Sequence, residues 1–228
     1  MSAAPEPNEP PTGRPYQSAR RRQQAAENRD LILSAAGGLF AERGWPGTGM
    51  RDIAAEAGVA VETVYANFRS KADLLLAAID AAVAGDTKEV PLAARSEFLS
   101  LAEGDFPTRV VAAARLSSQI NRRTAGLQRA LAHAADSDSA LADRRREHEG
   151  RRRISVEQGA EMVAGRPVTE RERDGLWAVL GSEVYLLLNE ISGWGVEQYE
   201  AWLADTILRL LDERPLTPPP SSKKGRPA

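Results

Sequence analysis

Apolar residues recur at helical spacing along most of the chain. The segment 20–43 shows the pattern clearly, with apolar residues at i, i+3, i+4, i+7 and i+8: Ile32, Ala35, Ala36, Leu39 and Phe40. This spacing places their side chains on one face of an amphipathic helix. Arg43 and Gly44 follow, as is typical of a helix C-terminus. We therefore predict a first helix from Arg20 to Arg43.

Three shorter helices are predicted next, over residues 49–57, 61–67 and 71–84. Thr48 is the expected N-cap of the first of these helices, and Gly58 is expected to end it. Ser70 is the expected N-cap of the third, with Asp73 as the acidic partner of a capping box.

The chain from Gly85 onward predicts a larger set of helices, over residues 92–102, 107–121, 126–135 and 141–163. A capping-box pattern at Thr169 and Glu172 then precedes an apolar helical stripe that runs from Leu176 to Ile191 and ends at Gly193. A last stripe runs from Tyr199 to Leu210. Because Ala and Leu dominate and β-rich runs are absent, we expect an all-α protein.

Composition excludes several classes of protein. The chain contains no cysteine, which removes disulfides and thiolate metal sites. No apolar run approaches the roughly 18 residues of a membrane span, and the N-terminus lacks the layout of a signal peptide. No cluster of Asp, Glu and His has the spacing of metal ligands. We expect a cytoplasmic protein without a metal or cofactor.

Residues 48–68 have the features of a helix-turn-helix. Ile53, Ala54 and Ala57 give the first helix a narrow apolar face, and Gly58 permits a left-handed turn. Val59, Val64 and Phe68 are expected to anchor the second helix inward. The residues left to face a DNA groove or its walls are Val61, Glu62, Thr63, Tyr65 and Asn67.

The run from Thr48 to Leu75 resembles the DNA-binding signature of the TetR family. The matching positions are Ile53-Ala54, Ala57-Gly58-Val59, Thr63, Tyr65, Phe68, Lys71 and Leu74. The resemblance covers about residues 31–79. It implies an N-terminal three-helix DNA-binding domain followed by a larger helical domain for ligand binding and dimerisation. The expected division is a disordered arm (1–18), the DNA-binding domain (19–84), the effector-binding and dimerisation domain (85–213), and a disordered basic tail (214–228).

The same resemblance implies roles for individual residues at DNA. Thr48 and Arg51 would hold phosphates, and Lys71 would meet a phosphate at a helix N-terminus. Thr63 and Tyr65 would contact the DNA backbone or base edges. The cluster Arg20, Arg21 and Arg22 would either track the adjacent backbone or minor groove, or form a solvated helix start.

Three positions depart from the family pattern. Ala60 stands where a capping Ser is common, and Asn67 replaces a frequent His or Tyr. Glu62 would repel phosphate, so its use at DNA would be to accept a hydrogen bond from a cytosine N4 amine.

Two groups of residues in the larger domain remain open to more than one interpretation. The arginines at 144–146 and 151–153 alternate with acidic residues, which favours a self-paired helix surface over a second nucleic-acid site. Aromatic residues at helical spacing indicate core, interface or pocket positions. Candidate ligand contacts are Phe98, Trp177 and Tyr185. Candidate dimer contacts are Trp177, Leu180, Val184, Leu188, Tyr199, Trp202, Leu203 and Leu210.

The leading functional hypothesis is a homodimeric transcriptional repressor. A small-molecule effector would release it from a palindromic double-stranded operator, by favouring a state that misfits the DNA. One alternative is a DNA-binding regulator that is controlled by a protein partner or acts without a ligand. An enzyme on a helical scaffold is disfavoured, because the sequence shows no nucleophile–base pair, phosphate loop or metal cluster.

Overall fold

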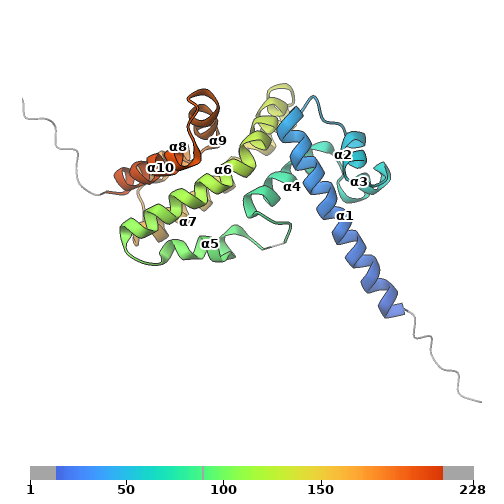
Figure 1. The fold of residues 1–228 in the computed structure, drawn as a ribbon, viewed down its shortest axis with the longest axis horizontal. Helices are drawn as coiled ribbons and strands as arrows, with labels where there is room; N and C mark the ends of the chain where they lie inside the picture. Colours follow the sequence, from blue (N-terminus) through green and yellow to red (C-terminus); the bar gives the residue numbers. More distant parts are fainter. Residues whose placement is uncertain (1–13, 89, 213–228) are drawn as a thin grey trace, which may run out of the picture.

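The computed structural model describes residues 14–88 and 90–212, and within them the predicted all-α fold is confirmed, since no strand occurs. The proline-rich segments 1–13 and 213–228 lie outside the described residues. In Figure 1 a long first helix projects beyond the rest of the molecule, with three short helices packed beside its upper half. These first elements are α1 (Arg14–Arg43), α2 (Met50–Glu56), α3 (Val61–Asn67) and α4 (Lys71–Ala84).

The larger body is built around two long antiparallel helices, α6 and α7, with shorter helices on either side (Figure 1). A linker of short turns joins α4 to α6 and contains η1 (Leu92–Ala94), α5 (Ser96–Leu99) and η2 (Ser100–Ala102). The main body elements are α6 (Phe106–Ser137), α7 (Ser139–Ala164), α8 (Glu170–Val179), α9 (Ser182–Leu186), the π-helical turn η3 (Leu187–Ile191) and α10 (Val196–Leu211).

Two hydrophobic clusters hold the chain together. The first joins the buried faces of α1 to α4, with Ile32, Phe40 and Ile53 fully buried, and it extends onto α6 through Leu127 and Leu131. The second packs α6, α7, α8 and α10 around Leu176, Tyr199 and Leu203. Because α6 contributes to both clusters, it couples the N-terminal helices to the body.

Helix α6 corrects the prediction of two separate helices over 107–121 and 126–135. It is continuous, and Gly126 lies inside it instead of marking a break. A Cβ at Gly126 would lie 2.9 Å from Cβ of Ala41 on α1. This glycine therefore serves the close approach of α1 to α6, a tertiary requirement that the local sequence does not reveal.

The prediction of one continuous stripe from Leu176 to Ile191 is also wrong. The helix ends at Val179, and the chain resumes as α9 after Gly181. The π-helical turn η3 closes this segment with a 3.0 Å bond from the Ser192 N–H to the Leu187 carbonyl. The extra residue in a π turn shifts which side chains face outward.

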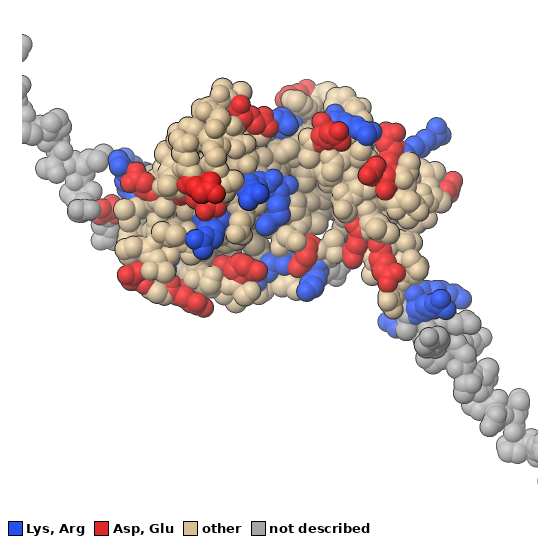
Figure 2. Space-filling view, viewed as in Figure 1, with Lys and Arg blue, Asp and Glu red and all other residues tan. Residues whose placement is uncertain are grey.

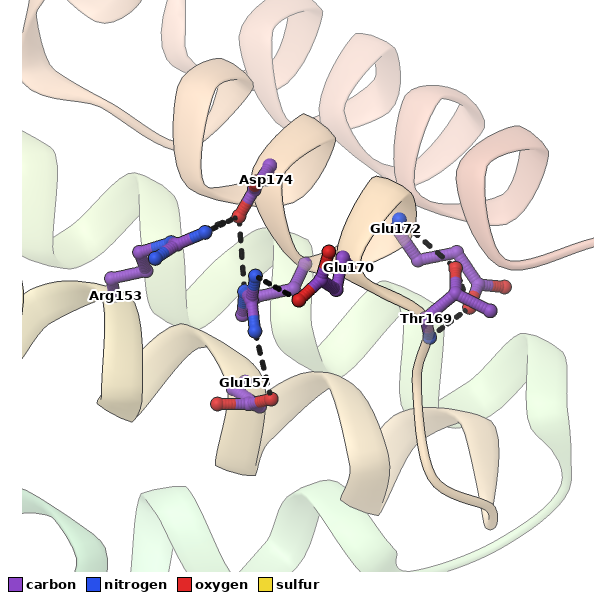
Figure 3. Close-up of polar contacts among 7 residues, drawn as sticks. Arg153, Glu157, Thr169, Glu170, Glu172 and Asp174 are labelled. Carbon is purple, nitrogen blue, oxygen red and sulfur yellow. Dashed lines mark hydrogen bonds and ion pairs between the residues drawn. The ribbon is translucent and has the colours of Figure 1, made fainter.

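The predicted helix starts are confirmed at two places. Thr169 Oγ1 accepts from the Glu172 N–H while the Glu172 carboxylate accepts from the Thr169 N–H, a complete capping box (Figure 3). The Ser70 hydroxyl likewise accepts from the Asp73 N–H at the start of α4. The first helix, however, begins at Arg14, six residues earlier than predicted. Pro15 lies in its first turn, where a missing N–H breaks no helical hydrogen bond.

Candidate nucleic-acid interface and internal cavity

Helices α2 and α3 form the predicted helix-turn-helix. Gly58 has φ of +67°, the left-handed conformation that a tight turn between two helices requires. Ile53 and Ala54 are buried on α2, and Val64 and Phe68 are buried at and just after α3. The packing of these four buried side chains fixes the angle of α3 against the N-terminal core.

The opposite face of α3 is open to solvent. Tyr65 has 55% of its surface exposed, and Glu62 is exposed beside it, while Val61, Thr63 and Asn67 are half-buried. The Asn67 amide donates a 2.8 Å hydrogen bond to the Thr63 carbonyl, which holds the Asn67 side chain against its own helix. Tyr65 and Glu62 are therefore the most prominent groups on this face.

Thr48 does not have its expected roles. Its side chain is buried, and its hydroxyl donates to the carbonyls of Leu39 (3.1 Å) and Gly44 (2.9 Å). The N-cap of α2 is Gly49, whose N–H donates a 2.8 Å hydrogen bond to the Asp52 carboxylate. Thr48 thus closes the turn after α1, and it is not available to a phosphate.

Lys71 is held at the start of α4 by the turn between α1 and α2. Its ammonium donates to the Trp45 carbonyl and lies 4.1 Å from the centroid of the Trp45 ring. Burial lowers the pKa of Lys71, opposed by the nearby Asp52 carboxylate. The Trp45 ring in turn stacks on Phe40 of α1. Lys71 therefore has a structural role that the sequence did not indicate.

The remaining candidate DNA contacts are basic and exposed. Arg51 lies in the first turn of α2, and Arg20, Arg21 and Arg22 lie near the projecting end of α1. Figure 2 shows basic side chains gathered at this end of α1, where the described chain begins. They are separated from α3 along the chain and lie on the first helix of the same group.

Five of the six arginines at 144–146 and 151–153 are paired with carboxylates of α7 or of neighbouring helices, which favours the predicted self-paired surface, while Arg151 is exposed. Arg152 bonds Glu149 at 2.8 Å, and Arg146 bonds Asp143. Arg153 reaches across to Asp174 of α8 at 2.6 Å, as Figure 3 shows. Because these charges are already compensated, α7 is not a second candidate nucleic-acid site.

A cavity of about 690 Å³ lies between the N-terminal helices and the body. Its wall combines Leu33 of α1 and Ala81 of α4 with residues of α6, α7, α8 and α10, such as Ile120, Val156 and Leu176. The volume is within the range of small-molecule sites. A molecule in this cavity would contact both groups of helices at once.

Only one of the three aromatic residues predicted to contact a ligand lines the cavity. Phe98 lines the cavity, but Trp177 and Tyr185 do not. The Trp177 indole N–H donates to Glu149 and its ring lies under Arg152, while the Tyr185 ring packs edge-on against Tyr199. The polar residues of the wall were missed, namely Ser117, Asn121, Thr124, Gln128 and His148. The first four have a helical spacing of 4, 3 and 4, which is the signal that could have found them.

Two arginines of the body bind the two ends of α4. Near its N-terminus, Asp73 accepts a 2.5 Å bond from Arg144 of α7, and hydrogen bonds from Arg144 and Ser70 lower the pKa of Asp73. At its C-terminus, Arg123 of α6 donates to the carbonyls of Ala82 and Val83. Neither contact was predicted from the sequence.

The residues predicted to contact a partner chain differ in burial. Tyr199 and Leu203 are fully buried within the protomer, so they cannot contact a partner chain. The apolar side chains that stand out most are on η3, where Leu187 is 59% exposed and Ile191 is 78% exposed. The other candidates are half-buried: Trp177, Leu180, Val184, Leu188, Trp202 and Leu210.

Neither a membrane-spanning helix nor a metal-binding cluster occurs in residues 14–88 and 90–212. No helix there combines the length and apolar character needed to cross a bilayer. No group of three or more His, Cys, Asp or Glu side chains is arranged to hold a metal ion.

Comparison with solved structures shows the fold. The chain is similar to a transcriptional regulator from Rhodococcus sp. Rha1 (23% identity, TM-score 0.58, covering 80% of this chain and 95% of that one). It is similar to two proteins assigned to the TetR family. One is from Rhodococcus sp. (17% identity, TM-score 0.62, covering 82% of this chain and 99% of that one). The other is from Mesorhizobium loti MAFF303099 (22% identity, TM-score 0.59, covering 82% of this chain and 96% of that one).

A family model gives evidence on the family that these distantly related structures do not provide. No curated protein matches the chain. Residues 32–78 match the model of the bacterial regulatory proteins of the tetR family, and this segment includes all of α2 and α3 and most of the contacts that position them. An N-terminal three-helix DNA-binding domain with a helix-turn-helix is thus followed by a larger helical domain. Over residues 32–78 the chain matches the tetR family of bacterial regulatory proteins, and this match supports a TetR family regulator.

Proposed function

We propose that the chain is a homodimeric repressor that leaves a palindromic operator when a small molecule enters the 690 Å³ cavity. Residues 19–84 bind DNA, and residues 85–213 bind the effector and the partner chain. The observation that carries the proposal is the composition of the cavity wall, which joins α1 and α4 to helices of the body. A ligand can shift a conformational equilibrium only if it interacts differently with the two states, and a site shared by both groups of helices meets that condition.

The DNA contacts of this proposal are made by the exposed groups of the N-terminal helices. Tyr65 and Glu62 on α3 enter the major groove with Val61, Thr63 and Asn67 at its walls. Arg51 contacts a phosphate, and the half-buried Lys71 does so with the ammonium hydrogens that its bond to the Trp45 carbonyl leaves over. Arg20, Arg21 and Arg22 follow the neighbouring backbone or minor groove.

The partner chain binds at the surface of α9 and η3. Exposed apolar side chains at Leu187 and Ile191, with half-buried Val184 and Leu188 alongside, form a patch suited to a two-fold contact with its own copy. A two-fold axis would place two copies of α3 on one side of the DNA.

Relatives of similar fold support an effector-responsive role. One is described as the multidrug binding protein EbrR complexed with imidazole (21% identity, TM-score 0.52, covering 82% of this chain and 97% of that one). The protein from Clostridium perfringens is described as a regulator of fatty acid metabolism (18% identity, TM-score 0.55). Only one of these descriptions names a bound molecule, so the chemistry of this cavity has to be argued from its own wall.

Selection of bound sequences from random DNA at stated salt tests the proposal. An enriched palindrome, with half-sites about one helical turn apart or slightly more, is the expected result. The recovered sequence then serves as the probe for ligand-induced release. A folded, dimeric sample that enriches no sequence would overturn the operator-binding role.

A further inference from the structure

Uncharged polar side chains are concentrated on one side of the cavity wall, although Thr87, Ser155 and Ser182 also line it. Helix α6 presents Ser117, Asn121, Thr124 and Gln128, which follow one another at i, i+4, i+7 and i+11 and all line the cavity. We call these four residues the polar stripe. Since a helix rises about 1.5 Å per residue, the stripe is about 16 Å long. The remaining wall is mainly aliphatic, with Val156, Ala160, Leu176 and Ile207 among its residues.

Asn121 offers an unused acceptor at the middle of the polar stripe. It is buried, and its amide nitrogen donates to the Tyr199 hydroxyl (2.9 Å) and to the Leu180 carbonyl (3.3 Å). Its Oδ1 atom accepts no hydrogen bond from any residue that the structure describes. Among the described residues, Ser118 Oγ is the one fully buried side-chain oxygen or nitrogen without a hydrogen-bond partner. Asn121 Oδ1 is therefore reachable from the cavity that Asn121 lines, where a ligand donor would bond it.

Gln128 and His148 define the chemistry at one end of the polar stripe. Gln128 Nε2 lies 2.9 Å from His148 Nε2, and because an amide NH₂ only donates, His148 Nε2 accepts. The imidazole is then neutral, with its proton on Nδ1, and burial lowers the pKa of His148 in the same sense. Gln128 Oε1 and His148 Nδ1–H have no partner within the described part of the chain.

The charged residues of the wall are either at its edge or already paired. Asp80, Lys88 and Arg151 are exposed to water. Asp86 is bound by Arg95 through two hydrogen bonds of 2.8 and 2.9 Å, and its pKa is lowered to about 2 by that contact. Glu149 is bound by Arg152, and Arg29 lies 4.8 Å from the centroid of the Phe68 ring.

We propose that the cavity binds an uncharged, elongated, amphipathic molecule whose hydroxyl or other donor groups bond the polar stripe. An anionic group against the stripe would meet the oxygen acceptors of Asn121, Thr124 and Gln128. A cationic group would lose its water without gaining an unpaired carboxylate in the interior. A neutral donor forms hydrogen bonds there without either penalty. This inference rests on the proposed function, because it takes the cavity to be the effector site.

Three probes with one chain length and different charge test the proposal: dodecanediol, dodecanedioate and diaminododecane. Binding is measured on the full-length protein without DNA, by calorimetry and by the shift in Tm. We expect the diol to bind and raise Tm, and the dicarboxylate and the diamine to bind at least about tenfold more weakly. Equal or tighter binding of either charged probe would overturn the proposal, as would no binding of the diol.

Variants of the polar stripe test where the probe binds. The combined variant Ser117→Ala, Thr124→Val and Gln128→Met removes three of the four polar side chains of the stripe with little change in volume. It keeps Asn121, which also bonds Tyr199 and Leu180. The control is Gln119→Leu on the exposed side of α6. We expect the combined variant to bind the diol about tenfold more weakly than the parent, and the control to bind it as tightly as the parent. If the combined variant does not fold, Thr124→Val alone serves, because the Thr124 hydroxyl bonds only the Ile120 carbonyl of its own helix. Unchanged diol binding in a folded stripe variant would overturn the assignment.

A separate measurement distinguishes this inference from the proposed function. Release from the selected operator is followed by fluorescence anisotropy of labelled DNA in the presence of the diol. Release that disappears in the stripe variant supports both ideas. Binding of the diol without release would refute the effector role while supporting the ligand class of the cavity.

Discussion

The Nε atom of Arg123 donates a 2.7 Å hydrogen bond to the carbonyl of Ala82, which joins the middle of α6 to the last turn of α4. A second bond of 3.2 Å runs from the same guanidinium to the Val83 carbonyl. The last carbonyls of a helix have no partner within it, so a cation placed there satisfies them and interacts favourably with the helix dipole.

Replacing Arg123 by Met should therefore weaken the contact between α4 and the body. We expect a loss of about 1 kcal/mol in the free energy of unfolding, since two helix-end carbonyls lose a charged donor at a partly exposed site. Urea unfolding measures the change. Arg122→Met is the matched control, because Arg122 is the exposed neighbour on α6 and has no partner among the described residues. Equal stability of the two variants would contradict a role for the Arg123 contact.

Replacing Tyr65 by Ala should weaken operator binding without affecting the fold. More than half of the Tyr65 surface is exposed and no side chain hydrogen-bonds to it in the described residues, so the free energy of unfolding should change by less than about 0.5 kcal/mol. Loss of one DNA contact should weaken binding about tenfold at fixed salt, measured by fluorescence anisotropy. Gln119→Ala, on an exposed face of α6 remote in sequence from α3, should bind like the parent. Undiminished affinity of the Tyr65 variant would remove this residue from the interface.

Glu62 should act on sequence preference more than on affinity. The Glu62 carboxylate is proposed to accept a hydrogen bond from a cytosine N4 amine. Replacing Glu62 by Ala would remove this base-specific contact and one negative charge near phosphates. We expect a flattened preference at one position of each half-site, with overall affinity nearly unchanged. Selection of bound sequences for the parent and the variant in parallel measures this. Identical preferences at every position would contradict the cytosine contact.

Stability should fall in mild acid because of His148. Its pKa in the folded protein is lowered from the ordinary value of 6.5 by burial, so the unfolded chain binds the proton more tightly than the folded one. This contribution to stability is complete above about pH 6.5 and is lost progressively as pH falls below that value toward the folded-state pKa.

The matched variants His148→Gln and His133→Gln isolate this effect, since His133 is exposed on the neighbouring helix α6. Thermal unfolding between pH 7.5 and 5 is the measurement, with the pH range chosen to bracket an ordinary His, about 6.5. We expect the parent and the His133 variant to lose Tm together, and the His148 variant to lose less. Parallel curves for all three proteins would show that His148 does not titrate during unfolding.

Replacing Ile191 by Asp should disrupt the dimer. Ile191 is the most exposed large apolar side chain of the described residues, and a carboxylate there would be desolvated against its own copy across a two-fold axis. Sedimentation velocity should show more monomer, with a dissociation constant of the dimer at least tenfold higher, or about 1.4 kcal/mol in the free energy of association. Ile154→Asp is the control, because Ile154 of α7 is also exposed but lies outside the patch on α9 and η3. A fully dimeric Ile191 variant would place the interface elsewhere.

Local signals accounted for the all-α fold and for the helix-turn-helix. The period of the apolar residues placed α1 to α4, and the cap pairs Ser70–Asp73 and Thr169–Glu172 marked helix starts that the structure confirms. These features depend on residues within a few positions of one another, so the chain encodes them without reference to the rest of the molecule. The inward positions of Val64 and Phe68, and hence the exposure of Tyr65, follow from the same periodicity.

Tertiary contacts decided the rest, because those contacts join residues far apart in the chain. Gly126 lies inside a helix instead of starting one, and its missing side chain leaves room for Ala41 of α1. Thr48 is buried, with its hydroxyl bonded to the carbonyl of Leu39. The polar stripe became a candidate ligand site only when α7, α8 and α10 enclosed it. Sequence periodicity identifies the face of a helix that is buried or polar, whereas the partner of that face is set by packing between elements.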